Sequence, residues 1–117
     1  MTLEECYKEL GGDYNDAIGR LRSVRLLQKF VLKFLEDGSF ELLCRSLDDG
    51  NIEEAFRAAH TIKGMCQNLG FTALAESDSA LTEVLRGGGT DTDGLFDKVK
   101  EDYERTADAI RAYQSQL

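Results

Sequence analysis

The chain has 117 residues, of which 42% are hydrophobic, and a net charge of −8 near neutral pH. This length suits one ordinary domain, and the hydrophobic fraction is large enough for a core, which argues against wholesale disorder. The acidic balance argues against a nucleic-acid-binding protein, because such a protein needs a basic face to neutralise phosphates. No hydrophobic run approaches the roughly 20 residues of a membrane span, so no membrane partner is expected. The three widely spaced cysteines fit no disulfide or metal motif and are interpreted as reduced thiols of a cytoplasmic protein.

A helical period of about 3.6 residues runs through the sequence, which contains no proline. It predicts amphipathic segments at residues 2–10, 13–21, 23–47 with an interruption at Gly38, 51–69, 72–86 and about 90–117. Long amphipathic helices joined by short turns are typical of an antiparallel bundle. A coiled coil is less favoured, because each apolar stripe ends after about three or four turns at a glycine-rich break. We therefore predict an all-α fold, a single domain over residues 1–117 built as an antiparallel four-helix bundle with one or two additional short N-terminal helices.

The one histidine of the chain, His60, lies in the middle of a predicted helix. At about 100° per residue, the apolar stripe of this helix centres near Ala59 and Cys66, so His60 is expected to point toward solvent. Arg57 and Lys63 lie about one turn away on either side, and no carboxylate is expected beside the imidazole on that face. Two cations next to a neutral, nucleophilic imidazole suit a histidine that carries a phosphoryl group better than one that acts as a general base.

Gly64 follows on the same side of this helix, although an interior glycine costs about 1 kcal/mol relative to alanine. Its missing side chain would leave the imidazole open. The plain alternative is that His60 belongs to an ordinary solvated face. A metal site is poorly supported, because a single histidine without spaced acidic or cysteine partners cannot fill a coordination shell. A nucleophilic pair of Cys66 with His60 is also poorly supported, because residues six apart lie on different faces of a helix.

Residues 59–64, Ala-His-Thr-Ile-Lys-Gly, followed by Gly70, resemble the H-x-x-K-G-x-x-x-x-x-G signature of histidine-containing phosphotransfer (HPt) domains. The similarity extends over residues 23–86 and, by general pattern only, over the last helix. It implies a four-helix bundle in which His60 accepts a phosphoryl group through Nε2. By the same resemblance, Lys63 stabilises the phosphoryl group and Gly64 leaves room for a partner.

The supporting residues that we expect around this site are Phe56, Arg57, Gln67 and Thr82. Many HPt domains carry glutamine or glutamate at the position of Thr82, where it holds the imidazole by Nδ1. The threonine departs from that pattern, so the resemblance implies that its hydroxyl or a water molecule makes this bond. Exposed parts of Phe56 and Met65 are expected in the docking rim.

The family occurs in two main settings, and both are kept as interpretations. In the favoured one, the domain is a phosphorelay intermediate that takes a phosphoryl group from a receiver-domain aspartate and passes it to another receiver. In the other, it is the N-terminal phosphotransfer domain of a chemotaxis-type histidine kinase. A helical interaction module that is never phosphorylated is the third possibility.

The partners implied are response-regulator receiver domains or a hybrid histidine kinase, with a monomeric chain. The sequence has no glycine-rich phosphate loop and no organised acidic cluster for Mg²⁺, so we expect a phosphoryl carrier and not an enzyme. No cofactor of its own is expected, since Mg²⁺ would be bound by the partner receiver.

Overall fold

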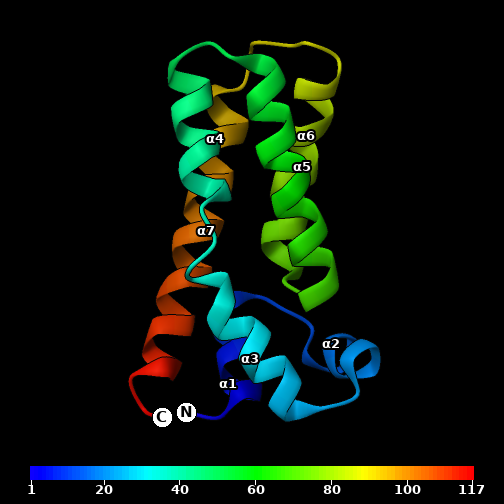
Figure 1. Ribbon diagram of the computed structural model, residues 1–117, viewed down its shortest axis with the longest axis vertical. Helices are drawn as coiled ribbons and strands as arrows, with labels where there is room; N and C mark the ends of the chain where they lie inside the picture. The colour runs from blue at the N-terminus through cyan, green and yellow to red at the C-terminus, as the bar shows by residue number, and fades with distance from the viewer.

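The chain forms seven α-helices and no β-strand in the computed structural model, which describes all of residues 1–117. In chain order the helices are α1 (Leu3–Leu10), α2 (Tyr14–Leu21), α3 (Val24–Phe34), α4 (Ser39–Asp48), α5 (Ile52–Leu69), α6 (Thr72–Arg86) and α7 (Asp93–Gln114). The first two are short, and α3 and α4 run one after the other with a break at residues 35–38 (Figure 1). The all-α prediction, including the interruption at Gly38, is therefore confirmed.

Helices α4, α5, α6 and α7 run antiparallel to one another and form the bundle in the upper half of the molecule (Figure 1). Helices α1 and α3 lie at its lower end beside the second half of α7, and α2 lies beneath the end of α5 (Figure 1). The two chain ends lie side by side there, and the amino group of Met1 donates to the side-chain oxygen of Gln116. None of the helices is long and apolar enough to cross a membrane.

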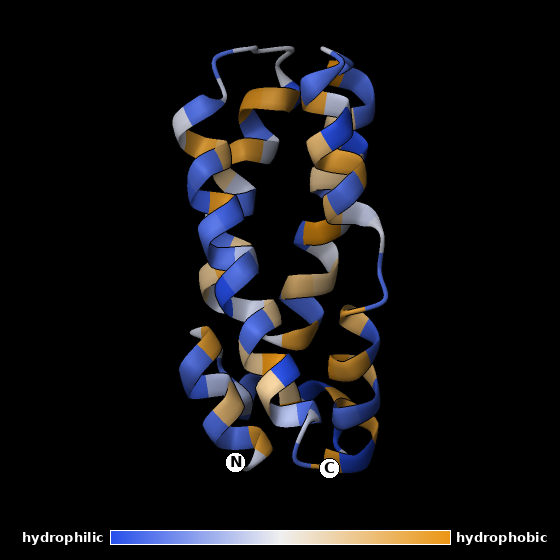
Figure 2. Ribbon diagram, turned by 90° about the vertical axis from the view of Figure 1, so that its left-hand side faces the viewer, coloured by the Kyte–Doolittle hydropathy of each residue, from blue (hydrophilic) through white to orange (hydrophobic).

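The hydrophobic stripes of the helices turn toward the interior, as Figure 2 shows by its inward-facing orange segments. Aromatic side chains join the lower end to the bundle: Phe71 contacts both Tyr7 and Phe34, and Tyr103 contacts both Phe34 and Phe40. The Tyr7 hydroxyl donates to the carbonyl of Leu69 at 2.7 Å, which satisfies a carbonyl at the end of α5. Packing and hydrogen bonding thus fix the C-terminal end of α5 from below.

The turn after α5 depends on Gly70, which has a φ of +68°. This left-handed conformation ends the helix, as the sequence predicted, and it favours glycine because it carries no Cβ. The carbonyl of Gly70 also accepts a hydrogen bond from the amide of Asp13 at 2.7 Å. A Cβ at residue 70 would lie 2.6 Å from the carbonyl oxygen of Asp13. Two backbones therefore meet at this glycine, which anchors the start of α2 beneath α5.

Replacing Gly70→Ala should lower the free energy of unfolding by more than the 1–2 kcal/mol or so that the left-handed conformation alone costs, because the methyl group also meets the backbone of Asp13. Gly88→Ala is the matched control, since Gly88 has a φ of +76° but open space around it. Chemical denaturation of both variants measures the difference. If both variants lost the same free energy of unfolding, the contact with the backbone of Asp13 would contribute nothing to the cost of Gly70→Ala.

Candidate functional site

His60 lies near the middle of α5, exposed to solvent. Asn51 caps the start of this helix by accepting a hydrogen bond from the amide of Glu54 at 3.1 Å. The opposite side of α5 is buried and consists of small and apolar side chains: Ala55, Ala58, Ala59, Ile62, Cys66 and Leu69. The helical period therefore placed His60 correctly on the open side of a well-anchored helix.

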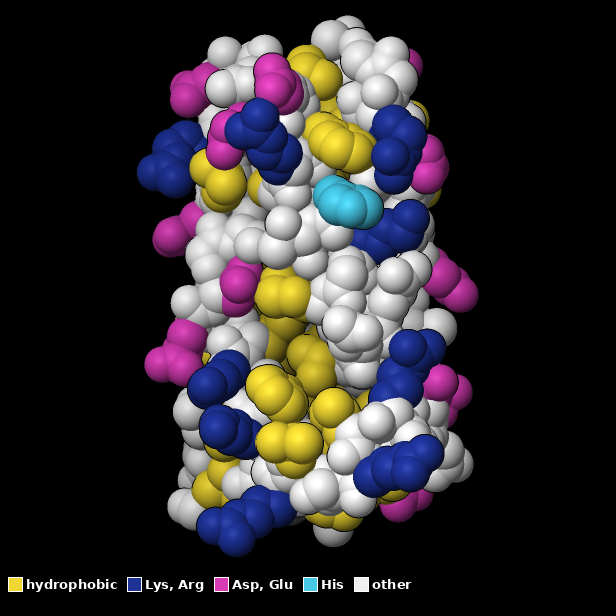
Figure 3. Space-filling view, turned by 45° about the vertical axis from the view of Figure 1, so that its right-hand side comes forward, with side chains coloured by type: hydrophobic (Ala, Val, Ile, Leu, Met, Phe, Trp, Pro, Cys, Tyr) yellow, Lys and Arg dark blue, Asp and Glu magenta, His cyan; other side chains and the backbone are white.

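The imidazole of His60 stacks on the ring of Phe56, one turn earlier in α5. The ring centroids lie 5.6 Å apart and the planes differ by 12°. The guanidinium carbon of Arg86, from the end of α6, lies 5.0 Å from the centroid of the Phe56 ring, a distance typical of a cation–π contact. Figure 3 shows the imidazole at the surface, with hydrophobic atoms and Lys or Arg side chains beside it.

The sequence analysis predicted two cations beside His60, and the structure shows that one of them, Arg57, is already paired with carboxylates. The guanidinium of Arg57 pairs with Glu53 at 2.7 Å and with Glu54 at 3.4 Å, both one turn toward the start of α5. Lys63, by contrast, is half-buried and takes part in no ion pair. Lys63 is therefore the cation of α5 whose charge is left available to an anion at His60.

Gly64 and Gln67 complete the exposed side of α5 around His60. A Cβ built at residue 64 would have no atom within 4 Å, so the space over this part of the helix is open. Gln67 is exposed one further turn along. Both positions agree with the sequence-based prediction of an uncovered face next to the imidazole.

Thr82 does not lie on this face, and its predicted role at the imidazole is corrected here. The side chain is fully buried, and its hydroxyl donates to the carbonyl oxygen of Asp78 at 2.7 Å. A threonine hydroxyl has one hydrogen to donate, so this bond within α6 leaves none for the imidazole. The side chain that does contact the imidazole is Phe56, through the stacked rings.

Asp78, which the sequence analysis missed, is a fully buried acid in the middle of α6. Its Oδ2 lies 3.3 Å from the Thr82 hydroxyl, and its Oδ1 has no hydrogen-bond partner. Burial raises the pKa of Asp78 to about 7, against smaller lowering effects from Thr82 and Lys63. The signal was present in the sequence, because residue 78 falls within the apolar stripe of α6 between Leu74 and Leu81.

An open groove of about 500 Å³ lies beside this face, between α2, α3 and α5. Its lining is mostly apolar with two cations: Arg20, Leu21, Phe30, Lys33, Phe34, Asp37, Met65, Asn68 and Leu69. The two lining cations belong to the stretch from residue 20 to residue 33, which holds five lysines and arginines and no acid, and Asp37 adds one carboxylate to the lining. The acidic molecule therefore has a concentrated basic stretch next to an apolar groove, which α5 lines with Met65, Asn68 and Leu69.

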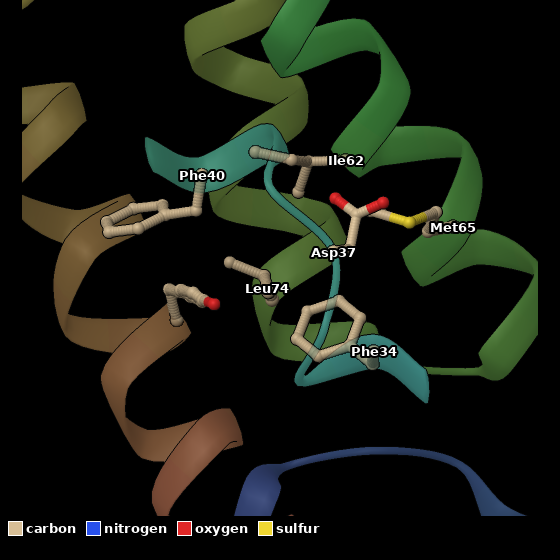
Figure 4. Close-up of a pocket in the computed structure, with 7 residues that line it drawn as sticks. Phe34, Asp37, Phe40, Ile62, Met65 and Leu74 are labelled. Atoms are coloured by element: carbon tan, nitrogen blue, oxygen red, sulfur yellow. The ribbon is translucent and has the colours of Figure 1, made fainter. Parts of the chain in front are cut away.

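A much smaller cavity of about 10 Å³ adjoins this groove, a volume that holds one water molecule at most. Figure 4 shows Phe34, Phe40, Ile62 and Leu74 around it, with the carboxylate of Asp37 next to Met65 at its edge. It is a packing gap of the core and not a ligand site. No group of three or more His, Cys, Asp or Glu side chains that could hold a metal ion occurs in the structure.

Comparison with protein families decides what this arrangement belongs to. The family model for the Hpt domain matches residues 25–109, which include the whole of α5 and α6. The chain belongs to the Hpt domain family. A search of curated proteins and a search of solved structures each gave no match. As an Hpt domain, the chain is a histidine-containing phosphotransfer module of two-component signalling, and such domains carry phosphoryl groups and interact with receiver domains and kinases.

Replacing Asp78→Asn should change how the stability of this Hpt domain depends on pH. The folded-state pKa of about 7 lies above the ordinary value of 3.8, so between these values the folded chain binds more protons than the unfolded chain. The contribution of Asp78 to the free energy of unfolding therefore falls as pH rises from about 4 to about 7. Relative to the parent, the variant should gain about 2–4 kcal/mol between pH 4.5 and pH 8. Urea denaturation of the parent and the variant across this range measures the gain. If the free energy of unfolding changed with pH in the same way in both proteins, the pKa of Asp78 would not be raised by folding.

Proposed function

We propose that this chain is a phosphorelay intermediate in which His60 accepts a phosphoryl group from a receiver-domain aspartate and passes it to another receiver. The observation that carries the proposal is the exposed imidazole, stacked on Phe56 and followed one turn later by an available cation, Lys63, and an open glycine position, Gly64. Such a group is reachable by a protein partner, and its direction is fixed before the partner arrives.

The transfer proceeds by attack of the Nε2 lone pair of a neutral imidazole on phosphorus. The P–Nε2 bond forms as the bond between phosphorus and the aspartyl oxygen breaks, and the aspartate carboxylate leaves. The hydrogen on Nδ1 stays on the ring, so phosphohistidine starts as an imidazolium that carries a dianionic phosphoryl group. Transfer to the next receiver is the same step in reverse. The receiver contributes the aspartate and its Mg²⁺.

Positioning and neutralisation of charge account for most of the catalysis of phosphoryl transfer. The parallel stack on Phe56 restricts rotation of the imidazole, which favours in-line attack. Lys63, one turn away and free of ion pairs, provides a charge-assisted contact for the phosphoryl oxygens. Arg57 contributes less, because its guanidinium is already shared between two carboxylates.

The groove beside α5 supports docking of a receiver on this side of the molecule. Met65 and Asn68 line it from α5, and Arg20 and Lys33 provide positive charge from α2 and α3. The phosphorylation pocket of a receiver is acidic, so this local basic region steers the encounter although the domain as a whole is negative. Phe56 and Met65, both half-buried, offer apolar contact area near His60.

Replacing His60→Gln should abolish uptake of acid-labile phosphate from a phosphorylated receiver, because no other side chain of the chain has the same reactive nitrogen. Stability should change by about 0.5 kcal/mol or less, as expected for a surface substitution. Intact-mass analysis before and after acid treatment measures the phosphate, and thermal unfolding provides the control for folding. Acid-labile phosphate on the variant would contradict the assignment.

Phosphorylation of the parent by the ATP-binding domain of a kinase, but by no receiver, would favour the chemotaxis-type setting.

Substitutions at Gly64 should affect the stability of the domain and the rate of phosphoryl transfer in opposite ways. Gly64→Ala and Gly64→Gln should each fold at least as well as the parent, with a gain of up to about 1 kcal/mol for alanine, because residue 64 is an open position inside a helix. Gly64→Gln should nevertheless transfer much more slowly, because its side chain occupies the approach to His60. Gly94→Gln is the control, since Gly94 is also open but lies on α7, which contributes nothing to the site. Transfer by Gly64→Gln at the parental rate would contradict the need for an open face.

A further inference from the structure

We propose that Asp78 and a phosphoryl group on His60 compete for the ammonium group of Lys63, so that phosphorylation is accompanied by uptake of a proton at Asp78. The inference rests on the proposed phosphorylation of His60 and adds a positioning residue inside the bundle. Asp78 touches neither the imidazole nor the partner, and it acts through Lys63.

The register of α5 and α6 brings Lys63 to the same level of the bundle as Asp78, and the two side chains form no ion pair in the structure. The two helices run antiparallel, and Arg86 lies over Phe56. Seven residues along α5 from Phe56 lead to Lys63, and seven residues back along α6 from Arg86 lead to residue 79, the neighbour of Asp78. Lys63 is half-buried, and its charge lowers the pKa of Asp78, which agrees with this register.

The hydrogen bonds around Asp78 leave Oδ1 without a donor and give Oδ2 only a long contact with the Thr82 hydroxyl. The single hydrogen of the Thr82 hydroxyl points to the Asp78 carbonyl at 2.7 Å, so the contact of 3.3 Å with Oδ2 is not a second full hydrogen bond. Oδ1 has no partner at all. A fully buried carboxylate in this situation needs either a proton or a nearby cation.

Lys63 is the cation that the surroundings of Asp78 supply. On α5, the other titratable neighbour is the buried thiol of Cys66, whose pKa is raised by burial and by Asp78. On α7, the nearly buried acid is Asp102, whose carboxylate already pairs with Lys98 at 3.1 Å. Neither helix therefore offers Asp78 a positive charge in place of Lys63.

The lysine side chain is long and flexible, so its ammonium group reaches either inward to the bundle or outward to solvent. A dianionic phosphoryl group on Nε2 attracts Lys63 outward. Asp78 then loses the stabilising effect of this charge on its carboxylate and takes up a proton from solvent, and the proton is released when the phosphoryl group leaves and Lys63 returns. Because phosphorylation takes up a proton, lower pH favours the phosphorylated form, by about tenfold for each unit by which phosphorylation raises the pKa of Asp78.

The direct test follows the Asp78 carboxyl carbon by ¹³C NMR while pH is varied. The chain is measured unmodified and after chemical phosphorylation with phosphoramidate, which needs no protein partner. The titration midpoint of Asp78 should rise on phosphorylation in the parent and stay constant in Lys63→Met. Asp102 is the internal control and should not move. An unchanged midpoint of Asp78 in the phosphorylated parent would overturn the inference, whereas absence of acid-labile phosphate on His60 would overturn the proposed function itself.

A second test measures the transfer equilibrium with a phosphorylated receiver at pH 6 and pH 8.5. At pH 8.5 the Asp78→Asn variant should hold several-fold more phosphoryl group than the parent, because no buried carboxylate competes for Lys63. At pH 6 the two should agree. Asp102→Asn is the matched control and should follow the parent. If the parent and Asp78→Asn held the same amount of phosphoryl group at both pH values, Asp78 and the phosphoryl group would not compete for Lys63.

Discussion

Helix α5 has to be packed tightly along one side and left bare along the other, and the rest of the structure follows from this constraint. Alanines at residues 55, 58 and 59 allow the neighbouring helices to approach closely without contributing bulk on the exposed side. The hydrogen bonds of Tyr7 and Gly70 fix the far end of the helix. A helix held in this way supports His60 on a packed backbone, while the side chain itself stays exposed.

Charge is distributed so that few cations remain free at the site. Arg57 is bound to two glutamates, and Arg86 is shared between Glu83 at 3.0 Å and the ring of Phe56. Surface ion pairs of this kind add little stability, but they keep the guanidinium groups in place. Lys63 lacks such a pair and lies between a buried acid and an exposed imidazole. In the proposed mechanism, this freedom of Lys63 matters more than the number of nearby cations.

Much of the fold was predictable, because helical periodicity, glycine positions and capping residues are local properties of the sequence. The outward direction of His60 and the open space at Gly64 follow from the same geometry. Contacts between helices were not predictable in this way: Arg86 reaches Phe56 across the α5–α6 interface, thirty residues further along the chain. Thr82 was assigned by its distance from His60 in the sequence, whereas the side on which it lies is set by the packing of α6. Asp78 was visible as a polar residue in an apolar stripe, but its missing hydrogen-bond partner is a three-dimensional fact.

The two chain ends emerge together at the lower end of the molecule, whereas the imidazole lies in the upper half (Figures 1 and 3). A polypeptide attached to either end, or to both, therefore departs from a point away from the phosphotransfer face. Adjacent ends also mean that the whole bundle fits into a surface loop of another protein with little separation between the two junctions. Such a junction would leave the face that carries His60 uncovered.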